Sequence, residues 1–563
     1  MKVLFISPEF PETFWSLRHA IKFLGVKALV PPLALLTVAA MLPPDWDKKL
    51  VDLNVEPLTD EHLAWSDLAF VSAMTIQSPS ADAIIRRCRA AGVKVCAGGV
   101  HFSTPGARFE SVDHLFIGEV EETLPVFLAD LAQGKALPEY RPSRFPDLAR
   151  SPVPAWKLLD HSQYVQMLVQ VCRGCPHDCD FCQVIVLYGR QPRYKDLSQV
   201  LAELQGLYDV GWRRDITFAD DNFICHHGKA KDILRVLGRW QAEHGYPFLF
   251  FAQVSMEVVD DPELLPLMAQ AGFVGLFLGI ETPDPASLKE CNKHQNLNRD
   301  LVEAVRTIQA HGIEVSGGFI VGFDSDSPNV FVHQADYIEK AAIPTAMINL
   351  LTAAPGTRLY RRLESEGRLL GESDGDTTMN ASCLNFIPKM GRERLLEGYK
   401  ALLGRLFEPE PFYRRVLTFL GHYRPNPLLP ARPATHREVL AVLKIIFELG
   451  LKEPGRRAFW SFLGRLLRHH PQRFPMGISI AAAGYHYRII THRFCELAGE
   501  PVPERTTGSN PPKKLSSYPD QKQESTDAKA REPEGDQVPG GNKINQNFPR
   551  EPGTFIQATE VEK

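Results

Sequence analysis

The chain has 563 residues, of which 44% are apolar and 23% are charged, the balance of a folded globular protein with several domains. Its formal net charge of −4 gives no overall attraction to nucleic acids or to anionic membranes. The longest apolar stretch, residues 28–42, is shorter than the roughly 20 residues of a membrane span and contains two prolines, so we expect a cytoplasmic protein with no nucleic-acid partner.

The first 145 residues predict a doubly wound α/β domain. Helical patterns alternate with five β-rich runs, at residues 3–8, 49–54, 68–74, 93–99 and 114–119. Near-continuous apolar strands separated by helices are typical of a parallel sheet, whose ligands bind beyond the carboxyl ends of the strands. Those ends here carry Ser72, Gly98, Gly99 and Gly118, and the glycines would let a ligand approach the backbone closely.

A linker at residues 146–163 precedes a second β/α series at residues 164–364. Its predicted strands are residues 164–172, 215–221, 248–255, 274–281, 314–323 and 345–353. Six strands are too few for a closed eight-stranded barrel and predict an open, partial (β/α)6 barrel with polar strand ends at one mouth.

Beyond the predicted barrel the strand pattern stops. Residues 365–500 repeat Leu, Phe and Arg at helical spacing and predict a helical C-terminal domain. Residues 501–563 are rich in Pro, Gly, Ser and Gln with few apolar residues, which predicts a disordered tail.

The most informative segment is Cys172-Arg-Gly-Cys175-Pro-His-Asp-Cys179-Asp-Phe-Cys182. In a long chain without a secretory pattern at its start, clustered cysteines favour metal or thiol chemistry over disulfides. Cys175, Cys179 and Cys182 follow a C-x3-C-x2-C spacing. A loop of this length can direct three thiolates to three corners of an iron–sulfur cluster and leave one iron open, whereas ferredoxin-type clusters use four cysteines.

Two alternatives apply to this loop. A zinc site would use three of these cysteines and His177 or Cys172, although zinc motifs usually contain two separated cysteine pairs. Cys172 closes a predicted strand, so we expect a buried thiol there rather than a ligand.

The loop, with Phe181 before its last cysteine and at the head of a partial barrel, resembles the radical S-adenosylmethionine (SAM) enzymes. The doubly wound domain in front resembles their cobalamin-binding subgroup. The resemblance extends to the branch that includes the hopanoid C-2 methylase, through strings such as Arg173-Gly-Cys175-Pro, Asp220-Asp-Asn-Phe223 and Gly279-Ile-Glu281-Thr.

The resemblance implies a 4Fe-4S cluster on the three cysteines, with SAM chelated at the open iron and cleaved to a 5′-deoxyadenosyl radical. It also implies SAM contacts at Phe181, Asp220, Asp221, Asn222, Gly279 and Glu281. For the Asp220–Asn222 string, which would face the methionyl ammonium, the alternative is a helix N-cap. For Glu281, which would face the ribose, the alternative is a structural salt bridge.

Cobalamin, if bound, should lack a histidine ligand from this domain. The first predicted strand runs into Ser7-Pro-Glu-Phe-Pro-Glu12 and carries no D-x-H-x-x-G motif. The one D-x-H, Asp60-Glu-His62, follows the second strand and is predicted to start a helix. The nucleotide tail would lie near Ser72, Gly98, Gly99 and Gly118; the alternative is a domain that keeps the fold but holds another ligand or none.

Two further residues lie near the predicted mouth. Gln253 ends a strand where related sequences often carry a glutamate, which leaves its role open. Cys291 is a candidate hydrogen donor, but a loop thiol without a role is the favoured interpretation, because nothing nearby except lysine would lower its pKa.

The segment 455–470 is basic, contains no acidic residue and predicts an amphipathic helix with Phe459, Phe462, Leu463, Leu466 and Leu467 on one face. We expect this helix to pack on the barrel. An interfacial helix that gives the protein a peripheral contact with the inner membrane face is the alternative.

The resemblance implies a cobalamin-dependent enzyme that methylates an unactivated carbon of a small-molecule or lipid substrate. It would draw electrons from a donor such as flavodoxin or ferredoxin. A radical enzyme of the same build that does not methylate is one alternative, and a zinc-stabilised binding module is another.

Overall fold

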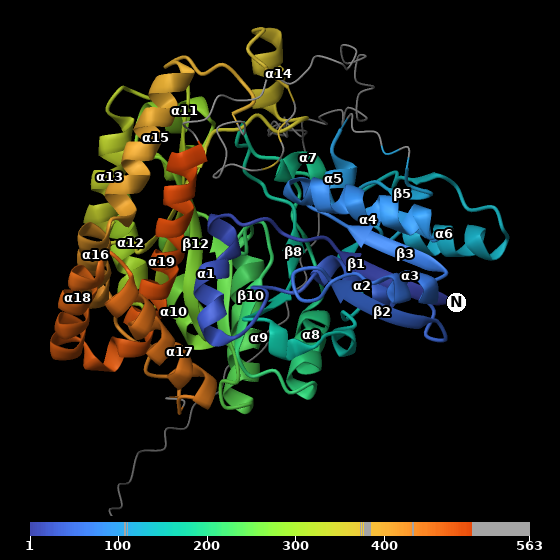
Figure 1. The fold of residues 1–563 in the computed structure, drawn as a ribbon, viewed down its shortest axis with the longest axis horizontal. Coiled ribbons are helices and arrows are strands. Elements are labelled where there is room, and N and C mark those ends of the chain that lie inside the picture. The colour runs from blue at the N-terminus through green and yellow to red at the C-terminus, as the bar shows by residue number, and fades with distance from the viewer. Residues whose placement is uncertain are drawn as a thin grey trace, which may run out of the picture. The chain divides into compact units, whose positions relative to one another are not determined.

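Two six-stranded parallel sheets carry the fold (Figure 1). The computed structural model describes residues 1–105, 109, 111–371, 373, 375, 384–430 and 433–497. The predicted tail, residues 501–563, lies outside the described residues.

The N-terminal sheet has the strand order β2-β1-β3-β4-β5-β6, with every pair parallel. Its strands are β1 (Lys2–Ser7), β2 (Asp47–Asp52), β3 (Leu68–Ser72), β4 (Lys94–Gly98), β5 (His114–Phe116) and β6 (Glu139–Tyr140). Its helices are α2 (Leu33–Met41), α3 (Asp60–Trp65), α4 (Ser78–Ala90), α5 (Val100–Ser103) and α6 (Thr123–Ala132). Leu4 and Ile6 belong to one core and Val3 and Phe5 to another, so the sheet is buried on both faces and the doubly wound prediction is confirmed.

The prediction of five strands in this domain missed β6. This strand has only two residues and lies at the sheet edge, where Leu115 pairs with Glu139. Two residues in a proline-rich stretch carry no alternating or continuous apolar pattern, so no strand could be predicted there.

The second sheet has the order β14-β13-β12-β11-β10-β7 and is open between its two edge strands, which confirms a partial barrel. Its strands are β7 (Met167–Val169), β10 (Asp215–Phe218), β11 (Leu249–Val254), β12 (Phe273–Glu281), β13 (Glu314–Val321) and β14 (Thr345–Leu350). The helices of this region are α8 (Leu197–Asp209), α9 (His227–Glu243), α10 (Leu264–Ala271), α11 (Pro285–Glu290), α12 (Leu301–Ala310), α13 (Val330–Ala341) and α14 (Arg358–Ser365).

The first barrel strand ends earlier than predicted. Instead of continuing to Cys172, the chain leaves the sheet after Val169, and Cys172–Arg173 forms a short strand, β8, antiparallel to β9 (Arg193–Tyr194). The Asp220 carboxylate accepts the Val171 and Cys172 N–H groups at 2.8 and 2.7 Å, so a side chain replaces a strand neighbour at this point.

The C-terminal region is helical, as predicted. It comprises α15 (Arg392–Phe407), α16 (Pro409–His422), α17 (His436–Phe447), a π-helical turn η10 (Glu448–Lys452), α18 (Arg456–His469) and α19 (Phe474–Leu497). These helices share one hydrophobic core with the barrel, and the Tyr399 hydroxyl donates to the Ile348 carbonyl of β14 at 2.9 Å. None of the helices in the described part of the chain has the length and apolarity that a membrane crossing requires.

The loop after β1 is anchored by the last helix. The Phe14 ring lies 5.7 Å from that of Phe407 and 5.6 Å from that of Tyr487, and His486 Nε2 lies 2.9 Å from the Thr13 carbonyl oxygen. The two ends of the described chain therefore meet in one buried contact.

Candidate functional site

The cysteine loop lies beyond the carboxyl end of β7, between β8 and α7 (Val184–Tyr188). Cys179 is buried and Cys175 and Cys182 are half-buried. The turn depends on Gly174, which has φ +91°, and a Cβ there would lie 3.1–3.2 Å from three backbone carbonyl oxygens of residues 188–191. The glycine before the first of the three cysteines thus allows the chain to fold tightly on itself.

The outer side of the loop is held by an arginine. Arg358 pairs with Asp178 at 2.8 Å and with Asp180 at 2.9 Å. Asn292 Nδ2 donates to the Asp178 carbonyl oxygen at 2.8 Å. These bonds fix the backbone that carries Cys179 and Cys182.

Both side chains proposed as a fourth zinc ligand have other partners. Cys172 is fully buried, and its Sγ lies 3.7 Å from Cys225 Sγ. His177 Nε2 lies 3.0 Å from Glu257 Oε2. Within the described ranges, no group of three His, Cys, Asp or Glu side chains could hold a metal ion. The prediction that Cys172 is a buried thiol agrees with these contacts.

Three thiols on one loop fit a 4Fe-4S cluster with an open iron, because cluster cysteines surround an inorganic core rather than a single ion. Burial raises the pKa of Cys175 and of Cys182 to about 12, and it also raises the pKa of Cys179. The free thiols are therefore neutral near pH 7, and cluster binding would displace their protons.

The predicted Asp220–Asn222 string braces this loop. Asp220 Oδ1 accepts the two N–H groups described above, and Asp221 Oδ2 accepts the Gly174 N–H at 3.1 Å. Asn222 Oδ1 accepts the Ser255 N–H beyond β11 at 3.1 Å. The alternative N-cap role is wrong, because the N-cap of α9 is His226.

One carboxylate oxygen of the Asp220–Asn222 string is buried without a partner in the described part of the chain. Asp220 is 2% exposed, and its Oδ2 has no hydrogen-bond partner among the described residues. Burial raises the pKa of Asp220 to about 7 and that of Asp221 to about 6. A buried acceptor without a partner, close to the cysteine loop, fits the ammonium group of SAM.

Glu281 forms a buried ion pair, which was the alternative to a ribose contact in the interpretation of the sequence. Its Oε1 accepts from Lys293 Nζ at 2.6 Å. A Cβ at Gly279 would lie 2.7 Å from Lys293 Nζ, so this glycine provides the space that the lysine occupies. Burial raises the pKa of Cys179 and the Lys293 ammonium opposes that rise, which puts Lys293 within electrostatic reach of the cluster loop. Lys293 was not predicted as a site residue, because no motif marks it.

The remaining mouth residues differ in accessibility. The half-buried Phe181 ring lies 6.2 Å from that of Phe323, and Gln253 is exposed near the end of β11. Cys291 is 3% exposed, burial raises its pKa, and its carbonyl oxygen accepts the Asp180 N–H at 3.0 Å. Its thiol lies buried behind the cysteine loop.

The predicted ligand residues of the N-terminal domain are close neighbours. Ser72 pairs with Gly98 across β3 and β4, and a Cβ at Gly99, where φ is +96°, would lie 2.8 Å from Ser72 Oγ. The Gly118 N–H donates to Ser103 Oγ at 2.8 Å. His62 lies in the first turn of α3, where its Nδ1 accepts the Thr59 N–H, so its expected place at a helix start is confirmed.

An ion-pair network joins this end of the N-terminal sheet to the cysteine loop. Arg173 Nη1 lies 2.7 Å from a carboxylate oxygen of Glu119 and 2.7 Å from one of Glu121. Arg193 also pairs with Glu119, at 2.6 Å. Glu119 directly follows Gly118 and Glu121 lies three residues after it, while Arg173 lies two residues before Cys175. Nothing in the local sequence marks this long-range network.

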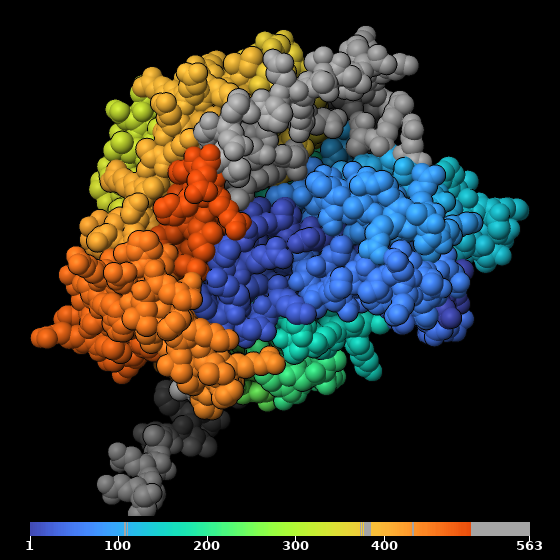
Figure 2. Space-filling model, viewed as in Figure 1, coloured from blue at the N-terminus to red at the C-terminus, as the bar shows by residue number. Residues whose placement is uncertain are grey.

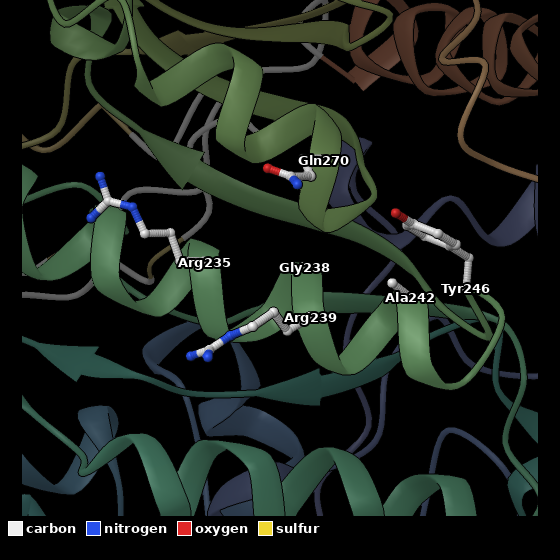
Figure 3. A pocket seen from close by; sticks show the side chains of 6 residues that line it. All are labelled: Arg235, Gly238, Arg239, Ala242, Tyr246 and Gln270. Carbon is white, nitrogen blue, oxygen red and sulfur yellow. The ribbon is translucent and has the colours of Figure 1, made fainter. Parts of the chain in front are cut away.

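A pocket of about 480 Å³ lies elsewhere, on the helical layer of the barrel (Figure 3). It is lined by side chains of α9 and α10 and of the turn after α9, namely Arg235, Gly238, Arg239, Ala242, Tyr246 and Gln270. None of the predicted site residues lines it, and Arg235 pairs with Glu263 at 2.9 Å.

Several known proteins resemble this chain in sequence, and others resemble it in fold. Residues 169–338 match the radical SAM superfamily and residues 357–498 match a domain of unknown function (DUF4070). The hopanoid C-2 methylase of Rhodopseudomonas palustris is 32% identical over 479 residues, which cover 83% of this chain and 90% of that protein. The chain belongs to the radical SAM methyltransferase family of the hopanoid C-2 methylase. An uncharacterized methyltransferase of Synechocystis sp. is 37% identical over 490 residues, 86% of this chain and 91% of that protein.

Solved radical SAM enzymes share the fold. OxsB, a cobalamin-dependent SAM radical enzyme, gives a TM-score of 0.55 at 14% identity and covers 88% of this chain and 80% of that chain. The radical SAM methyltransferase TsrM of Kitasatospora setae gives a TM-score of 0.51 at 14% identity, covering 89% and 100%. The family resemblance inferred from the sequence is confirmed, and membership of this enzyme family overturns the zinc-module hypothesis.

Proposed function

We propose that this radical SAM enzyme binds a 4Fe-4S cluster, SAM and cobalamin and methylates an unactivated carbon of a small-molecule or lipid substrate. Its relatives named as methyltransferases support the reaction type, and the relative named hopanoid C-2 methylase supports a lipid. When bound, the cluster, cobalamin and two SAM molecules per turnover would supply a radical that removes a substrate hydrogen atom and the methyl group that replaces it. The enzyme would act in the cytoplasm, at the inner membrane face for a lipid substrate, with electrons from a flavodoxin or ferredoxin.

The barrel residues would hold the cluster and orient SAM. Cys175, Cys179 and Cys182 supply the sulfur ligands, and the free Asp220 Oδ2 accepts from the methionyl ammonium. Through their hydrogen bonds, Asp221 and Asn222 hold the cysteine loop and the residue after β11 at fixed positions relative to Asp220 Oδ2. Fixing the SAM amino group beside the open iron converts a bimolecular encounter into an oriented one.

The adenosyl half of SAM would lie along β12 and Phe181. Lys293 neutralises one oxygen of Glu281 and holds the carboxylate at the strand end, from where it can accept a ribose hydroxyl. Gly279 leaves the space that this arrangement needs. The Phe181 backbone would face the adenine, while its ring packs toward Phe323 and keeps water out.

Cobalamin would bind at the end of the N-terminal sheet without a protein histidine on cobalt. The close approach at Gly99 and the positive φ of Gly118 suit the backbone contacts of a nucleotide tail near Ser72. The Arg173–Glu119–Glu121 network supports a position of this sheet end opposite the cluster loop.

The observation that carries the proposal is the loop of three thiols, whose neighbours Cys172 and His177 have other partners, joined by Arg173 to the glycine-rich sheet end. The test is anaerobic reconstitution with iron, sulfide and cobalamin, followed by incubation with methyl-labelled SAM, a reductant and a lipid extract from a strain that lacks the gene. We expect labelled lipid together with 5′-deoxyadenosine. Deoxyadenosine with an unlabelled but altered product would instead assign a non-methylating radical reaction.

A further inference from the structure

Helix α17 and the turn after it expose an apolar ridge, which we call the α17 surface. It consists of Val439 (49% exposed), Leu440 (40%), Leu443 (58%), Phe447 (51%) and Leu451 (57%). Four of these residues recur at every fourth position, so they form a continuous stripe along the helix and η10. Helix α17 lies at the lower edge of the view in Figure 1, and its orange segment forms part of the surface seen in Figure 2.

The neighbouring helix α18 buries most of its large apolar side chains, as an amphipathic surface helix usually does. It buries Phe459, Phe462, Leu463 and Leu466, although Leu467 is 52% exposed and was wrongly placed on that face. The helix packs mainly against α16, α19 and η10 of the C-terminal region, and not against the barrel as predicted. Helix α17 instead buries only Ala441 and Ile445 and directs its larger apolar side chains outward. Exposed stripes of this kind mark interaction sites.

The charge around the α17 surface is positive, although the chain as a whole carries −4. Residues 436–469 contain seven lysines and arginines against three glutamates. Two of the glutamates form ion pairs: Glu448 with Lys452 at 3.2 Å and Glu453 with Arg488 at 3.4 Å. Cations exceed anions in this segment by four, and Lys444, Arg456 and Arg457 are exposed, so the field of the segment is positive.

A half-exposed tryptophan borders the surface. Trp460 of α18 is 47% exposed, and its Nε1 donates to the Gly450 carbonyl oxygen of η10 at 2.9 Å. This bond holds the indole beside Leu451. An apolar stripe bordered by tryptophan and basic side chains matches the layers of an anionic bilayer, where acyl chains lie below charged headgroups.

We propose that the α17 surface binds the surface of an anionic lipid bilayer. Leucine and phenylalanine would enter the headgroup–acyl boundary, and the flanking lysines and arginines would contact lipid phosphates. The charge complementarity favours a membrane over a second copy of this chain, because two copies of the surface would bring like charges together. The contact would concentrate the enzyme where a lipid substrate resides, but it uses no residue of the cofactor site.

The test is cosedimentation of the purified full chain with vesicles of phosphatidylcholine alone and of equal parts phosphatidylcholine and phosphatidylglycerol. We expect binding to the anionic vesicles that weakens at high salt and is at least about tenfold weaker to the neutral ones. Leu443→Glu combined with Leu451→Glu should reduce binding at least about tenfold. The matched control is Val126→Glu, because Val126 is 52% exposed on α6, and it should bind as the unaltered chain does.

A second measurement does not depend on how well the double variant folds. Brominated anionic lipids should quench tryptophan fluorescence of the unaltered chain, and Trp460→Phe should remove most of that quenching. Failure to sediment with anionic vesicles, or equal loss in the control, overturns the proposal. Concentration-dependent dimers that the double variant abolishes would assign the surface to a second copy instead. SAM cleavage should be unchanged in all these variants, so a failure here is distinct from a failure of the methylation proposal.

Discussion

The barrel and the N-terminal sheet each have a proposed cofactor site at the carboxyl ends of parallel strands, but the two sites are built from different groups. The barrel end is built from side chains: three thiols, the Asp220 carboxylate and the Glu281–Lys293 pair. The N-terminal end is built from backbone, with Gly98, Gly99 and Gly118 beside Ser72. A cluster and a sulfonium need charged ligands at fixed points, whereas a large nucleotide-bearing cofactor needs space. Substitutions should therefore affect the two ends in opposite ways. Cofactor binding at the barrel end should be lost when side chains are shortened, and cofactor binding at the N-terminal end should be lost when side chains are added.

The largest effect is expected at the barrel end. Each of Cys175→Ala, Cys179→Ala and Cys182→Ala removes one of the three proposed sulfur ligands, so cluster iron and SAM cleavage should both be lost. Iron and sulfide analysis together with deoxyadenosine formation measures this. Cys172→Ala is the matched control and should retain both, because that thiol faces Cys225; loss of the cluster in the control would show that the ligand assignment is wrong.

The next largest effect lies between the two ends. Arg173→Met leaves the buried Glu119 and Glu121 carboxylates short of a cation, which costs about 3 kcal/mol of unfolding free energy. We expect a lower melting temperature and a larger loss of methylation than of SAM cleavage, because the two cofactor ends are no longer joined. Arg150→Met removes a 4.0 Å contact of an exposed arginine and should change neither quantity. Parallel loss of both activities would mean that Arg173 serves only the cysteine loop.

At the N-terminal end, an added side chain should be harmful. Gly99→Val forces its Cβ against Ser72 Oγ and the Ala73 carbonyl oxygen, 2.8 and 2.9 Å away, and should weaken cobalamin binding by about 2 kcal/mol, or about thirtyfold. Cobalamin titration followed by absorbance measures this, and cluster iron should stay constant. Gly92→Ala is the control: its φ is also positive, but its Cβ would meet no described atom within 4 Å. Equal affinity in both variants would place cobalamin elsewhere.

The smallest effect concerns protonation. Because burial raises the pKa of Asp220 to about 7, the carboxylate proposed to accept the SAM ammonium becomes ionised only as pH rises through 7. SAM affinity should increase between about pH 6 and 8 and then level off. Asp220→Asn should lower the affinity for SAM at pH 8 about tenfold and remove its dependence on pH. An unchanged dependence of SAM affinity on pH would exclude Asp220 as the acceptor.

The same raised pKa affects folding with a defined sign. The folded chain keeps the Asp220 proton between about pH 4 and 7, where the unfolded chain has released it. This contribution to stability is present at acid pH and is lost as pH rises toward 7. Denaturant titrations of the cluster-free protein should show that the free energy of unfolding falls as pH rises toward 7, and the Asp220→Asn variant should lack this fall.

Most of the fold and the ligand loop could be predicted from the sequence. All six barrel strands lie within or close to the predicted ranges, because a buried parallel strand is a continuous apolar run. The cysteine loop was visible because its ligands are local, at fixed spacing. Lys293 was not, because it meets Glu281 only through the turn after α11, and Arg173 was not assigned to Glu119, which is 54 residues away in the chain. A contact between segments far apart in the chain produces no periodic pattern in the sequence, so it cannot be predicted from local spacing.

The contact between Thr13, Phe14 and helix α19 sets an order on biosynthesis. The loop that follows the first strand emerges from the ribosome hundreds of residues before His486 and Tyr487, the partners that enclose it. Until translation reaches that final helix, Phe14 lacks Tyr487 and the Thr13 carbonyl oxygen lacks His486, although Phe407 is already present. A message truncated before residue 474 should thus yield a shortened chain whose opening loop is more accessible to protease than in the full chain.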